Sequence, residues 1–377
     1  MMKNSLTPFL LANLLCCWFF IGLSVIPAKA VPVLQDRAKR PVVSSQKQSA
    51  NKSANKKTIL QEVKVLGSYQ NISPYKKNIE AARPELALVE QKVPGNDFDS
   101  DTEPSHSQGC NNLQKKISAK SAFVMNATNG QTLFAVSPDT PRQPASTIKI
   151  LTGLIAIKSL ASSEAVSISL KAAEQPSSKI YLEKEKQYKA DDLINAVLLS
   201  SANDASVALA EKIAGSEQSF ARMMTLRAKL CGAQNTICKT ANGLTAEGQS
   251  TTARDLATIF KHAMQDEQFS QRIKQVKTRT AEGKLLRNHN KALWQIEGAE
   301  GGKTGFTNAA GQTYVGKFKR GSKEIIVAIM GSRTMWADLK TLVEYGFSQQ
   351  ESTVAKTTKD KEKPKVIAGL PVVSRRQ

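Results

Sequence analysis

Apolar and polar residues follow a regular pattern from about residue 121 to residue 347. Short apolar runs at 122–125 and 132–136 flank a polar turn, and a second pair of runs lies at 313–319 and 325–330. Apolar runs of this length joined by turn residues are typical of β-hairpins. The chain is therefore predicted to form at least two antiparallel pairs of strands.

Elsewhere in this region the apolar residues recur every three or four positions, which predicts helices. The predicted helices begin at Ser146 or cover 191–199, 205–214, 255–264 and 335–345. Strands at both ends and helices between them favour an α/β fold of the α+β type. We expect an antiparallel sheet flanked by helices, together with an all-helical lobe.

Three segments lack this pattern. Residues 1–30 contain a Lys, a long apolar run and an Ala-Lys-Ala site, which indicates a secretory signal peptide, with an uncleaved membrane anchor as the alternative. Residues 31–114 are predicted to be a disordered linker and 349–377 a disordered basic tail, which leaves one folded domain at 115–348. Both interpretations of the N-terminus predict an exported protein of the periplasm or cell envelope, attached to the membrane in the second case.

The 377 residues carry a formal net charge of +21. Much of this excess lies in the expected linker, where residues 31–57 hold seven Lys or Arg and one acidic residue, Asp36. An exported protein meets anionic lipids and wall polymers, so we expect an anionic membrane or wall surface as a partner and no nucleic acid. The alternative is that these charges only keep the linker solvated.

Cys231 and Cys238 are close enough in sequence to form a short loop disulfide in an oxidising envelope, which would leave Cys110 unpaired. The alternative is that all three are reduced. The spacing of the two cysteines fits no metal motif, and neither a metal nor another cofactor is predicted.

A serine and a lysine begin the first predicted helix. Ser-x-x-Lys occurs five times, but only Ser146-Thr147-Ile148-Lys149 opens an apolar helix, and the other four copies lie in the expected linker. With histidines only at 106, 262 and 289, a Ser-His-Asp triad is poorly supported. One helical turn puts Lys149 on the face of Ser146, where burial and a nearby cation would let a neutral lysine take the serine proton.

Two further motifs follow at larger spacing. Ser201-Ala202-Asn203 lies between two predicted helices, where helix capping is the alternative to a catalytic role. Lys303-Thr304-Gly305-Phe306-Thr307 precedes a predicted strand, and Gly305 would let a substrate approach the strand edge. The backbone N–H groups of Ser146 and Phe306 could then form an oxyanion hole. A phosphate loop is excluded because Glu297 stands where its first glycine belongs.

These three motifs, together with Asn242-Gly243-Leu244 and Gly331-Ser-Arg-Thr334, make residues 120–347 similar to the serine D-alanyl-D-alanine carboxypeptidases among the low-molecular-weight penicillin-binding proteins. The resemblance implies a β-lactamase/D,D-peptidase-like fold. It also implies hydrolysis of the terminal D-Ala-D-Ala bond of peptidoglycan stem peptides, an acyl-enzyme on Ser146, and β-lactams as covalent inhibitors.

The resemblance assigns catalytic roles to Ser146, Lys149, Ser201 and Asn203, and substrate binding to Lys303, Thr304, Gly305, Phe306, Thr307 and Arg333. Ser201 would shuttle a proton to the leaving amine, Asn203 would orient Lys149, and Arg333 would meet the substrate carboxylate. No Glu-x-x-Leu-Asn follows Asn203 to activate a deacylating water, so release of bound penicillin is expected to be slow. The alternatives are a D,D-endopeptidase that cuts cross-links and a non-catalytic wall-binding module.

Overall fold

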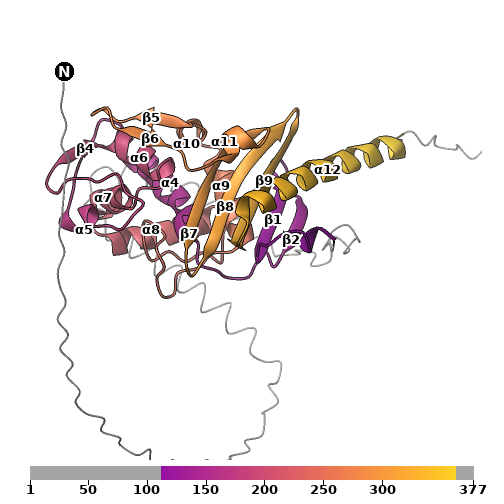
Figure 1. Cartoon of the computed structure of the whole chain (residues 1–377), viewed down its shortest axis with the longest axis horizontal. Helices are drawn as coiled ribbons and strands as arrows, with labels where there is room; N and C mark the ends of the chain where they lie inside the picture. Colours follow the sequence, from indigo (N-terminus) through magenta and orange to yellow (C-terminus); the bar gives the residue numbers. More distant parts are fainter. Residues whose placement is uncertain (1–111, 362–377) are drawn as a thin grey trace, which may run out of the picture. The chain divides into compact units, whose positions relative to one another are not determined.

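The protein is seen in a computed structural model that describes residues 112–361 (Figure 1). Five strands form one antiparallel sheet with the spatial order β2-β1-β9-β8-β7. The strands are β1 (Ser121–Asn126), β2 (Thr132–Val136), β7 (Ala299–Thr307), β8 (Gly311–Arg320) and β9 (Lys323–Ser332). The two predicted hairpins are confirmed, and β1 from the start of the domain pairs with β9 near its end. β7 lies at one edge of the sheet.

Helices between β2 and β7 form the predicted lobe. They are η1 (Ala145–Ile148), α4 (Lys149–Ser159), α5 (Leu170–Ala173), α6 (Ala190–Leu198), α7 (Asn203–Ala214), α8 (Glu217–Leu230), α9 (Ala253–Ala263), α10 (Glu267–Ile273) and α11 (Ala292–Gln295). Two small hairpins pair β3 (Ala165–Ser167) with β4 (Gln187–Lys189), and β5 (Lys277–Arg279) with β6 (Leu285–Arg287). The last helix is α12 (Met335–Lys361). The predicted fold class is confirmed.

The central sheet separates two hydrophobic cores. Alternate residues of β9 point to opposite faces, so that Ile326, Ala328 and Met330 join the core of the helical lobe, whereas Ile325, Val327 and Ile329 join the core beneath α12. Both sets are almost fully buried. A strand buried on both faces reads as a continuous apolar run, which is the pattern seen in this part of the sequence.

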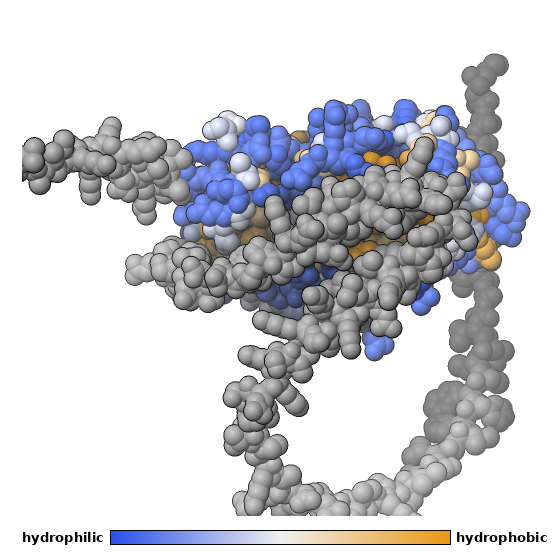
Figure 2. Space-filling view, turned by 180° about the vertical axis from the view of Figure 1, so that it is seen from behind, coloured by the Kyte–Doolittle hydropathy of each residue, from blue (hydrophilic) through white to orange (hydrophobic). Residues whose placement is uncertain are grey.

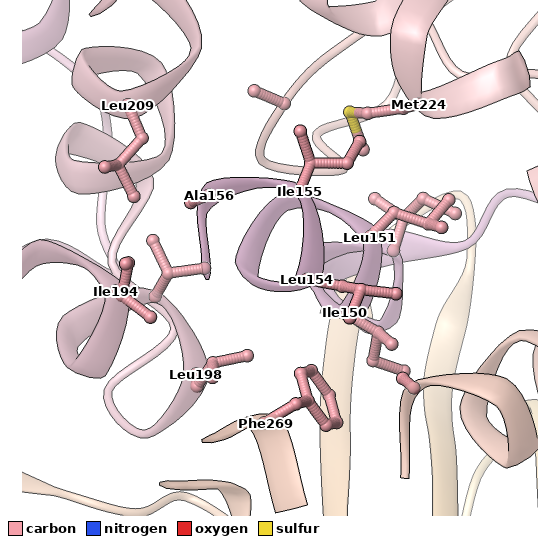
Figure 3. Close-up of a cluster of buried hydrophobic side chains, with 14 of the residues drawn as sticks. Ile150, Leu151, Leu154, Ile155, Ala156, Ile194, Leu198, Leu209, Met224 and Phe269 are labelled. Carbon is pink, nitrogen blue, oxygen red and sulfur yellow. The ribbon is translucent and has the colours of Figure 1, made fainter. Parts of the chain in front are cut away.

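Helix α4 forms the centre of the larger core. Residues 149–157 are all buried. Figure 3 shows Ile150, Leu151, Leu154 and Ile155 of this helix surrounded by apolar side chains of neighbouring helices. Burial on every side explains why the helix is apolar all round, without the polar face of a surface helix. The residues that begin α4 are consequently held by the best-packed part of the domain.

The part of the described surface that is visible in Figure 2 is mostly hydrophilic, and its apolar areas are small. Within residues 112–361 no helix is both long enough and apolar enough to cross a membrane.

Two predicted domain boundaries differ from the structure. Leu113 is buried in the core beneath α12, so the folded part includes residues that we had assigned to the linker. The predicted tail begins at residue 349, but α12 continues to Lys361. Helical hydrogen bonding can extend past the last apolar contact, which the apolar pattern alone does not reveal. The predicted signal peptide, nearly all of the linker, Cys110 and residues 362–377 lie outside the described residues.

The predicted disulfide between Cys231 and Cys238 is wrong, because both residues are buried free thiols. Cys231 ends α8 in a turn, where its N–H donates to the carbonyls of Arg227 and Ala228. Cys238 follows the bridge between Ile237 and Ser250, and burial raises the pKa of its thiol to about 12. Short spacing in the sequence does not by itself bring two cysteine side chains into the geometry that a disulfide requires.

Candidate active site

Ser146 lies in η1, the 3-10 turn that leads into α4, and its side chain is half-buried. The turn is held from behind because the carbonyl of Pro144 accepts hydrogen bonds from Thr147 Oγ1 at 2.6 Å and from Thr313 Oγ1 of β8 at 3.1 Å. Ala145 has a positive φ of 50°. Backbone strain of this kind persists only where the surrounding structure enforces it. The hydroxyl of Ser146 is therefore presented by a rigid turn between the lobe and the sheet.

Lys149 is fully buried, and its Nζ lies 2.9 Å from Ser146 Oγ. Its Nζ also donates to Asn203 Oδ1 at 2.7 Å and to the carbonyl of Asn242 at 2.6 Å. Burial and then the charge of Lys303 lower the pKa of Lys149 well below 10.5, while Asp204 opposes this change. A neutral amine has two N–H groups and one lone pair. The two carbonyl oxygens take the N–H groups, which leaves the lone pair for the Ser146 proton.

Ser201 and Asn203 lie where α6 ends and α7 begins. Helix capping does not explain them, because the residue that caps α7 is Ala202, which makes no side-chain cap. Ser201 has a φ of 58°, and its Oγ accepts a hydrogen bond from Lys303 Nζ at 2.9 Å. The Nδ2 of Asn203 donates to the carbonyl of Pro176 at 2.9 Å, which turns its Oδ1 toward Lys149. Both side chains thus point into the site as the sequence suggested.

Lys303 is the second buried lysine, on edge strand β7. Burial lowers its pKa to about 7. Its Nζ contacts Ser201 Oγ and the carbonyl of Thr304, and its charge is the largest electrostatic influence on Lys149. Two buried lysines that form no ion pair within the described residues are costly to fold, which indicates a functional site.

Gly305 has a role that differs from the one expected. A Cβ added at this position would lie 2.7 Å from Ser146 N and 2.5 Å from Thr313 Oγ1. The missing side chain therefore lets β7 pack directly against the turn that carries Ser146. We had assigned this space to an approaching substrate, but the chain itself occupies it. The effect is to bring the β7 backbone alongside the Ser146 N–H.

The remaining predicted residues lie at the end of β7 and next to it. Thr307 Oγ1 accepts a hydrogen bond from Thr245 Oγ1 at 3.1 Å, and the Phe306 side chain is 62% exposed. Arg333 directly follows β9 and is exposed. Because Phe306 pairs with Gln312 and Gln312 pairs with Ser332, Arg333 lies two strands from Phe306 at the same end of the sheet. No ion pair joins Arg333 to another residue of the described part.

Sequence reasoning gave no role to two residues that act on Lys149, one through a hydrogen bond and one through its charge. The carbonyl of Asn242 holds Lys149, and its position depends on Gly243, which has a φ of 78° and would place a Cβ 2.0 Å from the carbonyl oxygen of Ala145. Asp204 is fully buried and accepts backbone N–H groups from Ile180 and Leu182. The Asn-Gly pair was a sequence signal for the first residue. Nothing in the local pattern indicated the second.

His289 lies near both lysines but is not placed to act as a cation. Partial burial, then the charges of Lys303 and Lys149, lower its pKa to about 4 although part of the ring remains exposed. The imidazole is consequently neutral near pH 7. Among the described residues no group of His, Cys, Asp and Glu side chains is arranged to hold a metal ion. The close contact between Ser146 and a lysine of lowered pKa is an arrangement in which the lysine could take the serine proton.

Comparison with known proteins relates the whole arrangement to one family. Residues 108–334 match the family model described as D-alanyl-D-alanine carboxypeptidase. The D-alanyl-D-alanine carboxypeptidase DacF of Bacillus subtilis is 31% identical over 274 residues, which cover 66% of this chain and 69% of that protein. All of the predicted site residues, from Ser146 to Arg333, lie inside the matched region.

Solved structures agree with this match. The crystal structure of a Mycobacterium tuberculosis D-alanyl-D-alanine carboxypeptidase superposes with a TM-score of 0.58 and 31% identity, covering 61% of this chain and 91% of that one. Penicillin-binding protein D2 of Listeria monocytogenes, solved in an ampicillin-bound form, gives a TM-score of 0.56 and 27% identity, covering 61% of this chain and 98% of that one. The predicted D,D-peptidase-like fold is confirmed.

Proposed function

We infer that this chain, which belongs to the D-alanyl-D-alanine carboxypeptidase family, is a serine-type enzyme that removes the terminal D-Ala from peptidoglycan stem peptides. We propose Ser146 as its nucleophile and Lys149 as the general base. The observation that carries this assignment is the 2.9 Å contact between Ser146 Oγ and a buried lysine whose pKa is well below its ordinary value.

Acylation begins when Lys149 takes the hydroxyl proton and Ser146 Oγ attacks the carbonyl carbon of the scissile bond. The developing oxyanion would be stabilised by the backbone N–H groups of Ser146 and Phe306, each worth about 3 kcal/mol in comparable sites. Gly305 supports this role because it lets β7 pack against Ser146 N. The bond to the terminal D-Ala then breaks and leaves an ester on Ser146.

The departing amine needs a proton as the bond breaks. Lys149 holds the proton taken from Ser146, and Ser201 is placed to pass a proton onward while it accepts a hydrogen bond from Lys303. Lys303, Thr304, Thr307 and Arg333 would bind the carboxylate of the leaving residue, because charge-assisted hydrogen bonds are stronger than neutral ones. A water molecule then hydrolyses the ester, with Lys149 again serving as the base.

The exposed edge of β7 gives the substrate its orientation. An extended peptide can add to the free edge of a sheet by main-chain hydrogen bonds, and β7 is the edge strand beside Ser146. A β-lactam would present its amide carbonyl to the same serine, so β-lactams are proposed as covalent inhibitors. Slow release of the penicilloyl group follows because the sequence lacks the glutamate motif that would activate a deacylating water.

The proposed substrate places the protein outside the cytoplasm. We therefore retain export to the periplasm or cell envelope as a proposal, together with a signal peptide at 1–30 or an uncleaved anchor in its place. A D,D-endopeptidase remains the alternative enzyme, since it would use the same serine. A non-catalytic wall-binding module is less consistent with two buried lysines around a half-buried serine.

Labelling with a fluorescent penicillin tests the assignment. Ser146→Ala is expected to abolish the covalent adduct, and Lys149→Ala to reduce the acylation rate by about 100-fold or more, the range of general-base effects. Lys158→Ala is the matched control, because Lys158 is exposed on the same helix and makes a surface ion pair with Asp266. A labelled band from Ser146→Ala that withstands denaturation would contradict the assignment. Release of D-Ala from a pentapeptide, compared with cleavage of a cross-linked dimer, separates carboxypeptidase from endopeptidase.

A further inference from the structure

The outer face of the β5–β6 hairpin is a cluster of cations. Residues 271–291 contain seven Lys or Arg and one acidic residue, Glu282. In the hairpin, Lys277 pairs with Arg287, Thr278 with Leu286 and Arg279 with Leu285. Because Leu286 is 1% exposed, the pair that contains it faces the protein, and the other two pairs face outward. Lys277, Arg279 and Arg287 thus share one exposed face, which we call the hairpin face.

The cations of the hairpin face form no ion pair with the described residues, whereas Arg272, before the hairpin, pairs with Asp191. Neither Lys277 nor Arg287 forms an ion pair with any residue in the described part of the chain. The two lie directly opposite each other across the hairpin, an arrangement that destabilises a strand pair when the charges are alike. Lys274 and Lys291, at the two ends of the segment, are also exposed. Stability of the hairpin does not explain this charge, which is what a binding surface for an anion would require.

The hairpin face continues into the candidate active site. The carbonyl of Arg287 accepts a hydrogen bond from Ser200 Oγ at 3.2 Å, next to Ser201. Two residues further on, the N–H of His289 donates to the carbonyl of Leu199 at 3.1 Å. The hairpin face is therefore joined directly to the segment that carries Ser201, within reach of a polymer bound at Ser146.

We propose that the hairpin face is a docking surface for the carboxylates of polymeric peptidoglycan, borne by stem peptides next to the one being cleaved. The proposal rests on the proposed function. Stem peptides carry carboxylates, and several close cations on a surface raise the local concentration and the association rate of an anionic polymer. Continuity with the site favours the substrate polymer over an anionic membrane as the occupant.

Charge reversal at the two paired positions tests the proposal. The double variant Lys277→Glu, Arg287→Glu keeps a like-charged pair, so the hairpin should lose little stability. The control is Lys115→Glu, Lys116→Glu, which changes the net charge equally at two exposed residues near the start of the described chain. Sacculi stripped of phosphate polymers are the probe, and cosedimentation and D-Ala release are both measured.

In the hairpin variant, D-Ala release from sacculi and cosedimentation with them are expected to fall about tenfold at low salt, within the range of electrostatic steering. The difference should disappear at about 0.5 M salt, where the screening length is only a few ångströms. Acylation by penicillin and turnover of a soluble pentapeptide should stay unchanged. When the stem carboxylates of the sacculi are amidated, wild type and hairpin variant should bind the sacculi equally and release D-Ala from them at equal rates.

Several results would overturn the proposal. Equal binding of sacculi by wild type and hairpin variant would do so, as would an equal loss in the control variant. If the hairpin variant bound vesicles of phosphatidylglycerol less well than the wild type but bound sacculi equally well, the hairpin face would be assigned to a membrane. Failure of the proposed function is separate, since it appears as absent acylation and absent D-Ala release in the wild type while cosedimentation still reports on the hairpin face.

Discussion

Gly305→Ala should damage the active site through a single methyl group. The added Cβ would lie 2.7 Å from Ser146 N, 2.5 Å from Thr313 Oγ1 and 3.0 Å from Ala145 Cβ. Unstrained heavy-atom contacts are about 3.5 Å or longer, so β7 would have to move away from Ser146 N by about 0.8 Å and from Thr313 Oγ1 by about 1.0 Å. Thr313 is held by Pro144 and cannot yield freely. The displacement therefore falls on the backbone that carries Ser146 and Phe306.

A shift of about 1 Å between reacting groups can cost about 100-fold in rate, which corresponds to about 2.7 kcal/mol in the barrier. We expect acylation of Gly305→Ala by penicillin to slow by about this factor. Overpacking should also lower the free energy of unfolding by about 1–3 kcal/mol. The acylation rate is measured with a fluorescent penicillin, and stability by urea denaturation of the same preparation.

Gly346→Ala separates the local effect from general destabilisation. Its Cβ would meet Ile325 Cδ1 and Val124 Cγ1, both at 2.9 Å, in the core beneath α12. That core lies on the face of the sheet opposite the helical lobe. This variant should lose a similar amount of stability but acylate at the normal rate. Normal acylation by Gly305→Ala, or equal slowing in both variants, would refute the reasoning.

Two pH-dependent effects should also be measurable. The pKa of Lys303 is about 7 in the folded protein and 10.5 ordinarily, so the unfolded chain binds more protons between these values. The free energy of unfolding should therefore rise from pH 7 toward pH 10. Denaturation curves should show a smaller rise in Lys303→Met, and an equal rise in both proteins would contradict the lowered pKa of Lys303. Asp204 raises the pKa of Lys149, so Asp204→Asn should move the acid limb of the pH profile for penicillin acylation to lower pH. If the acid limb stays in place or moves to higher pH, Asp204 does not act on the pKa of Lys149. If the variant only loses the contacts to Ile180 and Leu182, activity should fall while the acid limb stays at the same pH.

The spacing of apolar residues along the sequence was enough to predict several strands and helices of this protein. Apolar spacing predicted the hairpins around β1 and β8, and it predicted that α4 is buried, because periodicity depends only on which faces are covered. The choice of Ser146 among five Ser-x-x-Lys copies also came from sequence, since only this copy opens an apolar helix. The structure confirmed the two hairpins and the burial of α4, but it contradicted the disulfide between Cys231 and Cys238, which spacing alone had suggested.

The sequence by itself predicted the fold class, two hairpins and the main helices, and it proposed the site residues, because these depend on side-chain type and near neighbours. It placed the Lys303 motif before a strand, whereas the motif lies within β7. Only the tertiary structure decided how the residues act on each other. Lys149 and Lys303 are far apart in the chain, and their lowered pKa values arise from burial in a shared site. The carbonyl of Asn242 and the fit of Gly305 against Ser146 are likewise backbone contacts, which no side-chain pattern encodes. Electrostatics and close packing act through space, so the reactivity that we propose for Ser146 depends on contacts that form only when the chain folds.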